Sequence, residues 1–166
     1  AYSLFRERLE ALPEDERTLE AQRKLWNKVV ADNLFVICKT PMAKTITQRT
    51  LCGYSEAKIN AHYFEDLIGM LQNKPHQFVD KVLRESYWKK GNGKMKFSAV
   101  VGNPPYQKSS NDTRATSRDM PIYNHFVEQA FSLNPQYVSM IIPSKWMATG
   151  LGLKDFRSNM LSDTRL

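Results

Sequence analysis

Apolar residues recur at helical spacing through the first 30 positions of the chain. A first helix is indicated by Tyr2, Phe5, Leu9 and Leu12. Pro13 then interrupts the pattern, and the acidic residues 14–16 suit the first turn of a second helix that runs to about residue 30. The pattern therefore predicts a helical N-terminal segment over residues 1–31.

From residue 32 onward, short apolar runs of strand length alternate with helical patterns. Three runs have the composition of buried strands, at residues 34–38, 97–102 and 137–142. A further strand is expected at 59–64, although its boundary stays open because residues 64–71 also fit a helix. Helices are predicted at residues 42–51, 78–87, 122–131 and 153–161. This alternation favours a mainly parallel sheet with helices on its faces, so residues 32–166 are predicted to be one α/β domain.

A polar stretch with almost no apolar residues spans residues 107–121, and we expect it to be a mobile loop beside a substrate. It directly follows Asn103-Pro104-Pro105-Tyr106, which ends the predicted strand at 97–102. In parallel α/β sheets, ligands bind outside the carboxyl ends of the strands. The four-residue motif is therefore the first place to look for chemistry.

Two consecutive prolines lack N–H donors and have fixed φ angles, so they hold carbonyl acceptors in fixed directions. Asn103 adds a side-chain carbonyl acceptor, and Tyr106 adds an aromatic face. Two fixed acceptors could hold an exocyclic amine such as adenine N6, while the ring stacks on the base. A base inside a duplex must be flipped out to reach such a site. Two prolines after a strand can also serve only to end it, although this combination with asparagine and an aromatic is rare by chance.

The run from Val100 to Gln107 resembles the catalytic motif of adenine-specific methylases of restriction-modification systems. The segments Pro121-Ile122-Tyr123, residues 140–146 and residues 153–157 are similar to later parts of those methylases. This resemblance implies a Rossmann-like methyltransferase fold. It also implies an enzyme that transfers a methyl group from S-adenosyl-L-methionine to a flipped-out adenine in double-stranded DNA. It assigns the catalytic positions to Asn103, Pro104, Pro105 and Tyr106.

The family's cofactor-binding features are matched less closely. The resemblance makes Asp66 the candidate for the cofactor adenine, although an ordinary surface acid would look the same. Cys38 and Lys39 stand where the family usually has an acidic residue for the cofactor ribose. No glycine-rich cofactor loop is found, because 91–93 lies in a basic turn and 150–152 follows a later strand. We therefore expect a sheet that is incomplete at both ends, and a chain that is inactive by itself.

The charge balance suits a polyanionic partner, since 24 Lys and Arg residues oppose 17 Asp and Glu residues and give a net charge of +7. Candidate contacts to DNA phosphates are Lys108, Arg114, Arg118 and Lys145. Cys38 and Cys52 form no zinc-binding pattern with the scattered histidines, so no metal is expected. No apolar run reaches the length of a membrane span, and two reduced thiols suit a cytoplasmic protein.

Two alternatives to a DNA adenine methyltransferase remain open at this point. The same motif can methylate a protein glutamine or an RNA base. The chain could also be a catalytically inactive, DNA-binding methyltransferase-like fragment. The family resemblance also suggests a partner for the methyltransferase, a restriction nuclease as a fused domain or a separate subunit, although the sequence shows no nuclease motif.

Overall fold

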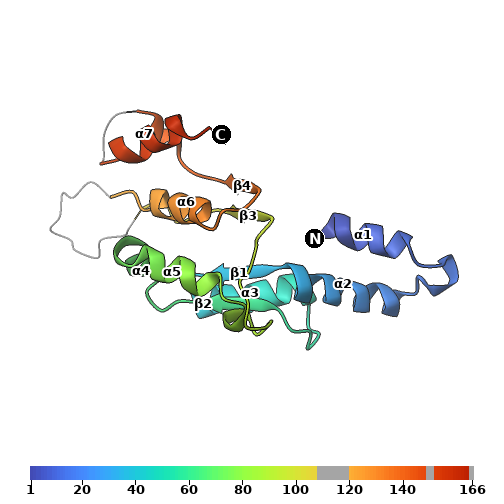
Figure 1. Cartoon of the computed structure of the whole chain (residues 1–166). Coiled ribbons are helices and arrows are strands. Elements are labelled where there is room, and N and C mark those ends of the chain that lie inside the picture. Colours follow the sequence, from blue (N-terminus) through green and yellow to red (C-terminus); the bar gives the residue numbers. More distant parts are fainter. Residues whose placement is uncertain (108–119, 149–151, 165–166) are drawn as a thin grey trace. The chain divides into compact units, whose positions relative to one another are not determined.

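The computed structural model describes residues 1–107, 120–148 and 152–164. The chain divides into two compact units, residues 1–67 and residues 68–166, and each is described by itself. Both contain short strands that pair in parallel, with helices around them (Figure 1). The mixed α/β class and the parallel pairing expected from the sequence are confirmed.

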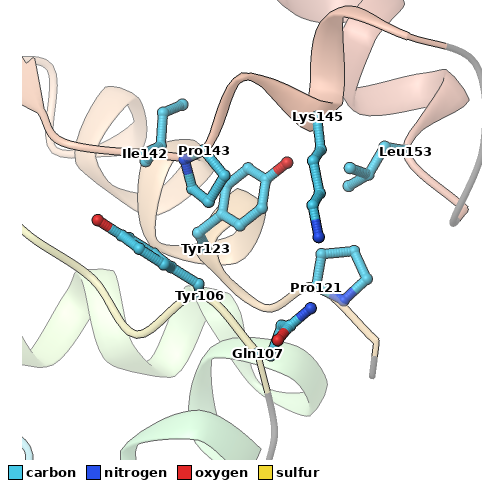
Figure 2. Close-up of a pocket in the computed structure, with 8 residues that line it drawn as sticks. All are labelled: Tyr106, Gln107, Pro121, Tyr123, Ile142, Pro143, Lys145 and Leu153. Atoms are coloured by element: carbon cyan, nitrogen blue, oxygen red, sulfur yellow. The ribbon is translucent and has the colours of Figure 1, made fainter. Parts of the chain in front are cut away.

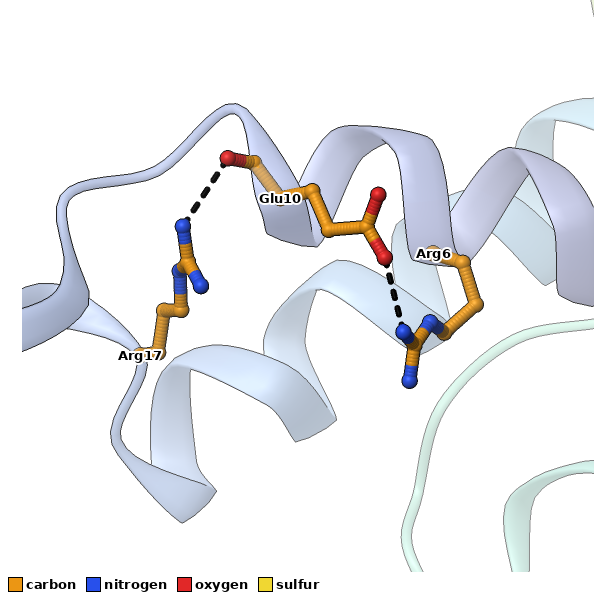
Figure 3. A network of polar contacts seen from close by, with 3 residues as sticks. All are labelled: Arg6, Glu10 and Arg17. Carbon is orange, nitrogen blue, oxygen red and sulfur yellow. Dashed lines mark hydrogen bonds and ion pairs between the residues drawn. The ribbon is translucent and has the colours of Figure 1, made fainter.

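Unit 1 opens with two helices separated by the break at Pro13. Helix α1 spans Tyr2–Glu10, the 3-10 turn η1 spans Glu14–Glu16, and α2 spans Leu19–Asn33. The connection is held by Arg17, whose guanidinium donates to the carbonyl oxygens of Glu10, at 2.9 Å, and Leu12, at 3.0 Å. The Glu10 carboxylate pairs with Arg6 at 2.7 Å (Figure 3). Helix α2 continues through residue 31, and a domain boundary at that position stays a prediction.

The strands of unit 1 are β1 (Phe35–Cys38) and β2 (Asn60–Tyr63), joined by helix α3 (Pro41–Cys52). The Thr40 hydroxyl caps α3 by accepting from the Ala43 N–H at 3.1 Å. Gly53 ends the helix at a φ of 61°, a conformation that favours glycine. The register places Cys38 opposite Tyr63, so β1 and β2 end at the same edge. The apolar side chains buried in unit 1 are Val29, Val30, Cys38, Ala61, Phe64 and Leu67.

The first part of unit 2 is helical. Helix α4 spans Leu67–Asn73, α5 spans Pro75–Val82, and the 3-10 turn η2 spans Glu85–Trp88. The predicted helix over residues 78–87 was therefore too long. An antiparallel bridge pairs Arg84 with Lys94, and the Met95 N–H donates to the Leu83 carbonyl at 2.7 Å. These bonds take the chain out of the helix even though its apolar spacing continues to Tyr87.

The second part of unit 2 contains strands β3 (Ala99–Gly102) and β4 (Tyr137–Met140), with helix α6 (Tyr123–Ser132) between them in the chain. The 3-10 turn η3 (Ser144–Met147) and helix α7 (Lys154–Ser162) follow. Figure 1 shows α6 beside the two strands, and α6 contacts β4. A core cluster joins α6 and α7 through Tyr123, Val127, Leu153 and Phe156.

Strands β3 and β4 lie where the apolar runs predicted them, but their expected full burial was wrong. Val101 is 75% exposed and Tyr137 is 64% exposed, whereas Met140 packs against the core cluster. Successive side chains of a strand point to opposite faces, so the alternating burial of β3 and β4 shows that one face of this sheet is covered and the other is open. In the described residues, β1–β2 and β3–β4 form separate sheets. A single Rossmann-like sheet stays a prediction. Among the described residues, no helix combines the length and apolar character needed to cross a membrane.

Candidate functional site

Strand β3 delivers Asn103 to the end of the β3–β4 sheet. The Gly102 carbonyl accepts from the Ile141 N–H at 2.9 Å, which extends the pairing one step beyond β4. A Cβ atom at Gly102 would lie 2.9 Å from the Met140 sulfur, on the residue opposite in register. A side chain at position 102 would therefore displace Met140 or the strand that carries Asn103.

The motif residues after β3 differ in their exposure. Asn103 is exposed, Pro104 is buried, and Tyr106 is 43% exposed. The Tyr106 hydroxyl donates to the side-chain carbonyl oxygen of Asn103 at 3.3 Å. This contact couples the acceptor and the aromatic ring that the sequence placed in one site. A carbonyl oxygen has two lone pairs, so the Asn103 oxygen retains capacity for a second donor.

Backbone contacts hold the two ends of the segment that follows Tyr106. The Ile122 N–H donates to the Tyr106 carbonyl at 3.1 Å, and Gln107 forms an antiparallel bridge with Pro121. Gln107 and Pro121 therefore lie side by side at the site, although 13 residues separate them in the sequence. Three predicted phosphate contacts, Lys108, Arg114 and Arg118, lie outside the described residues, as does most of the predicted substrate loop at 107–121.

A cavity of about 240 Å³ lies beside Tyr106. Its walls come from the motif, the start of α6, the segment after β4, and α7, and they comprise Tyr106, Gln107, Pro121, Tyr123, Ile142, Pro143, Lys145 and Leu153. Figure 2 shows the Lys145 ammonium and the Gln107 amide both directed toward Pro121, while the Tyr123 and Pro143 rings form an apolar wall. The cavity thus combines apolar surfaces with two polar groups that can reach a ligand.

Tyr123 is only 2% exposed and packs edge-on against Phe156 with the ring centroids 6.2 Å apart. Its hydroxyl oxygen is buried and forms no hydrogen bond among the described residues. Burial raises the pKa of the Tyr123 phenol, and the nearby Trp146 backbone partly offsets that rise without reaching hydrogen-bonding geometry. The phenol therefore stays neutral at ordinary pH, and its ring forms part of the cavity wall.

Within unit 2, the structure brings together three of the predicted site residues. Tyr106 and Lys145 line the same cavity, and Asn103 bonds to Tyr106. Asp66 belongs to unit 1, where it is exposed in the turn between β2 and α4. At the neighbouring end of β1, Cys38 is buried and Lys39 is exposed, so no carboxylate follows that strand directly. No group of three or more potential metal ligands occurs within the described part of the chain.

Six of the residues that line the cavity were not predicted as site residues: Gln107, Pro121, Tyr123, Ile142, Pro143 and Leu153. Gln107 directly follows the motif, and this proximity was an available signal. Pro121 and Tyr123 lie beyond the polar stretch, and Pro143 follows β4. The pairing of β3 with β4 brings Ile142 and Pro143 beside Tyr106, and the bridge from Gln107 brings Pro121 there. Tyr123 and Leu153 reach the cavity through the core cluster that joins α6 and α7.

Comparison with known proteins finds two matches, and both are methylases. The model of the Eco57I restriction-modification methylase family matches residues 32–166. A curated relative from Mycoplasma pneumoniae (strain ATCC 29342 / M129 / Subtype 1), described as an uncharacterized adenine-specific methylase, is 41% identical over 75 residues. That match covers 43% of this chain and 18% of the length of the relative. No solved structure matches the chain. Because the family model covers most of its residues, the chain belongs to the Eco57I restriction-modification methylase family.

Proposed function

We propose that this protein is a DNA N6-adenine methyltransferase that takes its methyl group from S-adenosyl-L-methionine. The observation that carries the proposal is the hydrogen-bonded pair of Asn103 and Tyr106 at the end of a parallel strand, beside a small cavity. Family membership supports a methylase, and the relative described as adenine-specific supports adenine as the acceptor. A complete Rossmann-like sheet, as the resemblance implies, is part of the same proposal.

Asn103 supplies the acceptor for the reacting amine. Its side-chain oxygen takes one hydrogen bond from Tyr106 and has a second lone pair for an N6 proton. The Pro104 carbonyl would accept the other N6 proton, because an exocyclic amine carries two. Held between two acceptors, the nitrogen is drawn toward tetrahedral geometry, and its lone pair becomes available for attack.

Tyr106 supplies the stacking surface. Its ring is 43% exposed, so one face can be covered by a base without removing a buried side chain from the core. The adjoining cavity is smaller than the roughly 300–1,000 Å³ typical of drug-sized ligands, and it suits a single flipped base. Lys145 and Gln107 would contact the edge of that base or its flanking phosphate.

The methyl donor carries a sulfonium group, whose methyl carbon is electrophilic and needs no metal for transfer. Asp66 is the residue of this chain that we propose to bind it, through hydrogen bonds from the donor's adenosine to the carboxylate. Asp66 fits because it is exposed in the turn that follows β2, three residues beyond Tyr63, and β1 ends at the same edge as β2. The buried thiol of Cys38 and the cation of Lys39 are poor acceptors for ribose hydroxyls.

The test is a methylation assay on duplex DNA with isotopically labelled donor, followed by digestion and mass spectrometry of the nucleosides. We expect label on N6-methyl-2′-deoxyadenosine with the full chain, together with any further segments it has in the cell. Asn103→Ala should abolish the product, whereas Asn159→Ala, an exposed asparagine on α7, should leave it unchanged. Label on a protein glutamine or on RNA, with DNA unlabelled, would replace the proposed acceptor.

A second candidate function is DNA binding without catalysis. The specific observation that favours it is the end of β1, where Cys38 and Lys39 stand in place of a ribose-binding acid. Calorimetric titration with S-adenosyl-L-methionine separates the two. Measurable binding that Asp66→Ala abolishes supports the enzyme, and duplex binding with no cofactor binding supports the non-catalytic reading.

A further inference from the structure

We propose that residues 84–96, here called the basic turn, bind the phosphate backbone of duplex DNA. This inference rests on the proposed function, because it takes duplex DNA as the substrate. It concerns a surface separate from the Asn103 motif and its cavity, in the part of unit 2 that precedes β3.

The basic turn concentrates the positive charge of the protein. It contains five cationic residues, Arg84, Lys89, Lys90, Lys94 and Lys96, and one anionic residue, Glu85. Five minus one gives +4, which leaves +3 of the net +7 for the other 153 residues. All five cationic side chains are exposed. A charge density this uneven favours a polyanionic partner over a generally solvated surface.

Backbone hydrogen bonds give the basic turn a defined shape. The Glu85 N–H donates to the Gly93 carbonyl at 3.0 Å, and the Lys90 N–H donates to the Glu85 carbonyl at 3.0 Å. The antiparallel bridge between Arg84 and Lys94 closes the turn. The cations are thus displayed from an ordered backbone, so binding would cost less conformational entropy than ordering a flexible tail.

The acidic residue of the turn is directed into it. The Glu85 carboxylate accepts from the Gly93 N–H at 2.9 Å. A Cβ atom at Gly91 or at Gly93 would collide with the same carboxylate oxygen, so the two glycines leave the space that Glu85 occupies. The one negative charge therefore has a structural role inside the turn, while the positive charges remain on its surface.

The turn is fixed to the core of unit 2 at its start. Trp88 is 3% exposed, and its indole N–H donates to the Val82 carbonyl at the end of α5 at 2.8 Å. Tyr87 packs edge-on against Trp88, with the two ring centroids 4.9 Å apart. The Lys81 ammonium lies 5.2 Å from the centroid of the Tyr87 ring. These contacts extend the basic surface onto α5 and hold it against the helix.

The composition of the turn favours duplex phosphates over single-stranded nucleic acid. A site for single-stranded nucleic acid needs exposed rings on which bases stack, but Tyr87 is half-buried and Trp88 is buried. Duplex DNA presents one charge per ~1.7 Å of its axis, and closely spaced cations match such a partner without reading its sequence. The turn is therefore assigned to positioning the substrate, with no part in choosing the base.

The experiment measures the dissociation constant of the full chain for a duplex over a range of salt concentrations. Lys94→Ala/Lys96→Ala removes two exposed cations that flank the half-buried Met95. Each lost phosphate contact lowers the slope of log K against log salt by about 0.9, so we expect a slope smaller by about 1.8. Affinity at low salt should fall about tenfold or more, and Lys94→Arg/Lys96→Arg should restore both values.

The matched control is Lys24→Ala/Lys28→Ala, which removes two cations from the exposed face of α2, where they pair with Glu20 and Asp32. It changes the net charge equally and should leave the slope unchanged. If the wild type binds and methylates DNA but the turn variant behaves like this control, the inference is overturned and the proposed function stands. A wild type that binds no duplex overturns both.

Discussion

The stacking role of Tyr106 can be tested by separating its ring from its hydroxyl. Tyr106→Phe removes the 3.3 Å hydrogen bond to Asn103 and keeps the aromatic face. A neutral hydrogen bond contributes about 0.5–1.5 kcal/mol, so we expect kcat/KM to fall by no more than about tenfold. Tyr106→Ala removes the ring, and base stacking worth about 1–3 kcal/mol corresponds to a loss of roughly 5- to 150-fold.

Neither substitution should unfold the protein. The side chain is 43% exposed and lies outside the core cluster of unit 2, and its backbone carbonyl still accepts from Ile122. Full burial of a large apolar side chain contributes about 1.5–3 kcal/mol, and this one is little more than half buried, so Tyr106→Ala should cost below about 2 kcal/mol. Urea titration gives the stability, and initial rates of DNA methylation give kcat/KM for both variants.

Three outcomes would refute this reasoning. Full activity of Tyr106→Ala would show that the ring does not hold the base. An unfolded Tyr106→Ala would make the residue part of the core. Equal losses for Tyr106→Phe and Tyr106→Ala would show that the hydroxyl matters and that the ring does not.

Two further predictions concern the frame around the site. Gly102→Val places a branched side chain against the Met140 sulfur, from which a Cβ atom alone would already lie only 2.9 Å away. We expect this substitution to lower the free energy of unfolding in urea by about 1–3 kcal/mol. If the double variant Gly102→Val/Met140→Ala recovers none of that stability, the clash with Met140 is not the cause. Burial raises the pKa of Tyr87 to about 12 from its ordinary value of 10. Below pH 10 both states keep the phenol proton, and between pH 10 and 12 only the folded state keeps it, so folding stability falls as pH rises through that window. Tyr87→Phe should show a shallower fall in alkaline unfolding curves than the wild type, and identical curves would count against the buried phenol.

Local sequence patterns were sufficient where local interactions decide the structure. The apolar spacing predicted a helix over residues 42–51, and α3 exceeds that range by one residue at each end, between its Thr40 cap and Gly53. The apolar runs located the four strands of the described residues, although β3 begins two residues later than expected. The Ser98 carbonyl accepts from the N–H groups of both Gln136 and Tyr137. The regular pairing of β3 with β4 therefore starts only at the next residue, Ala99. Helix α5 was predicted too long because the bridge at Arg84 depends on a residue ten positions away.

The candidate site divides in the same way. Asn103 and Tyr106 are three residues apart, so one short motif predicted both and their proximity. Tyr123 and Leu153 reach the cavity only through the packing of α6 against α7, and no local pattern identifies them as its walls. Lys145 was predicted from its position after β4, which the parallel pairing of β3 and β4 places beside the motif.

The two proposals constrain each other through strand β3, which joins the basic turn to the motif. Lys96 and Asn103 are seven residues apart, so even a fully extended chain separates them by at most about 23 Å. Along one strand of a duplex, with a phosphate every 3.4 Å or so, that length corresponds to about seven nucleotides. One short duplex can therefore contact the basic turn while an adenine occupies the site at Tyr106. Because the strand between them is hydrogen-bonded to β4 along its length, the distance from the anchored phosphates to the reacting base is set by the sheet. A phosphate-binding element on this strand would then contribute to catalysis by fixing where along the duplex the flipped base enters, which a cation cluster on a flexible tail could not do.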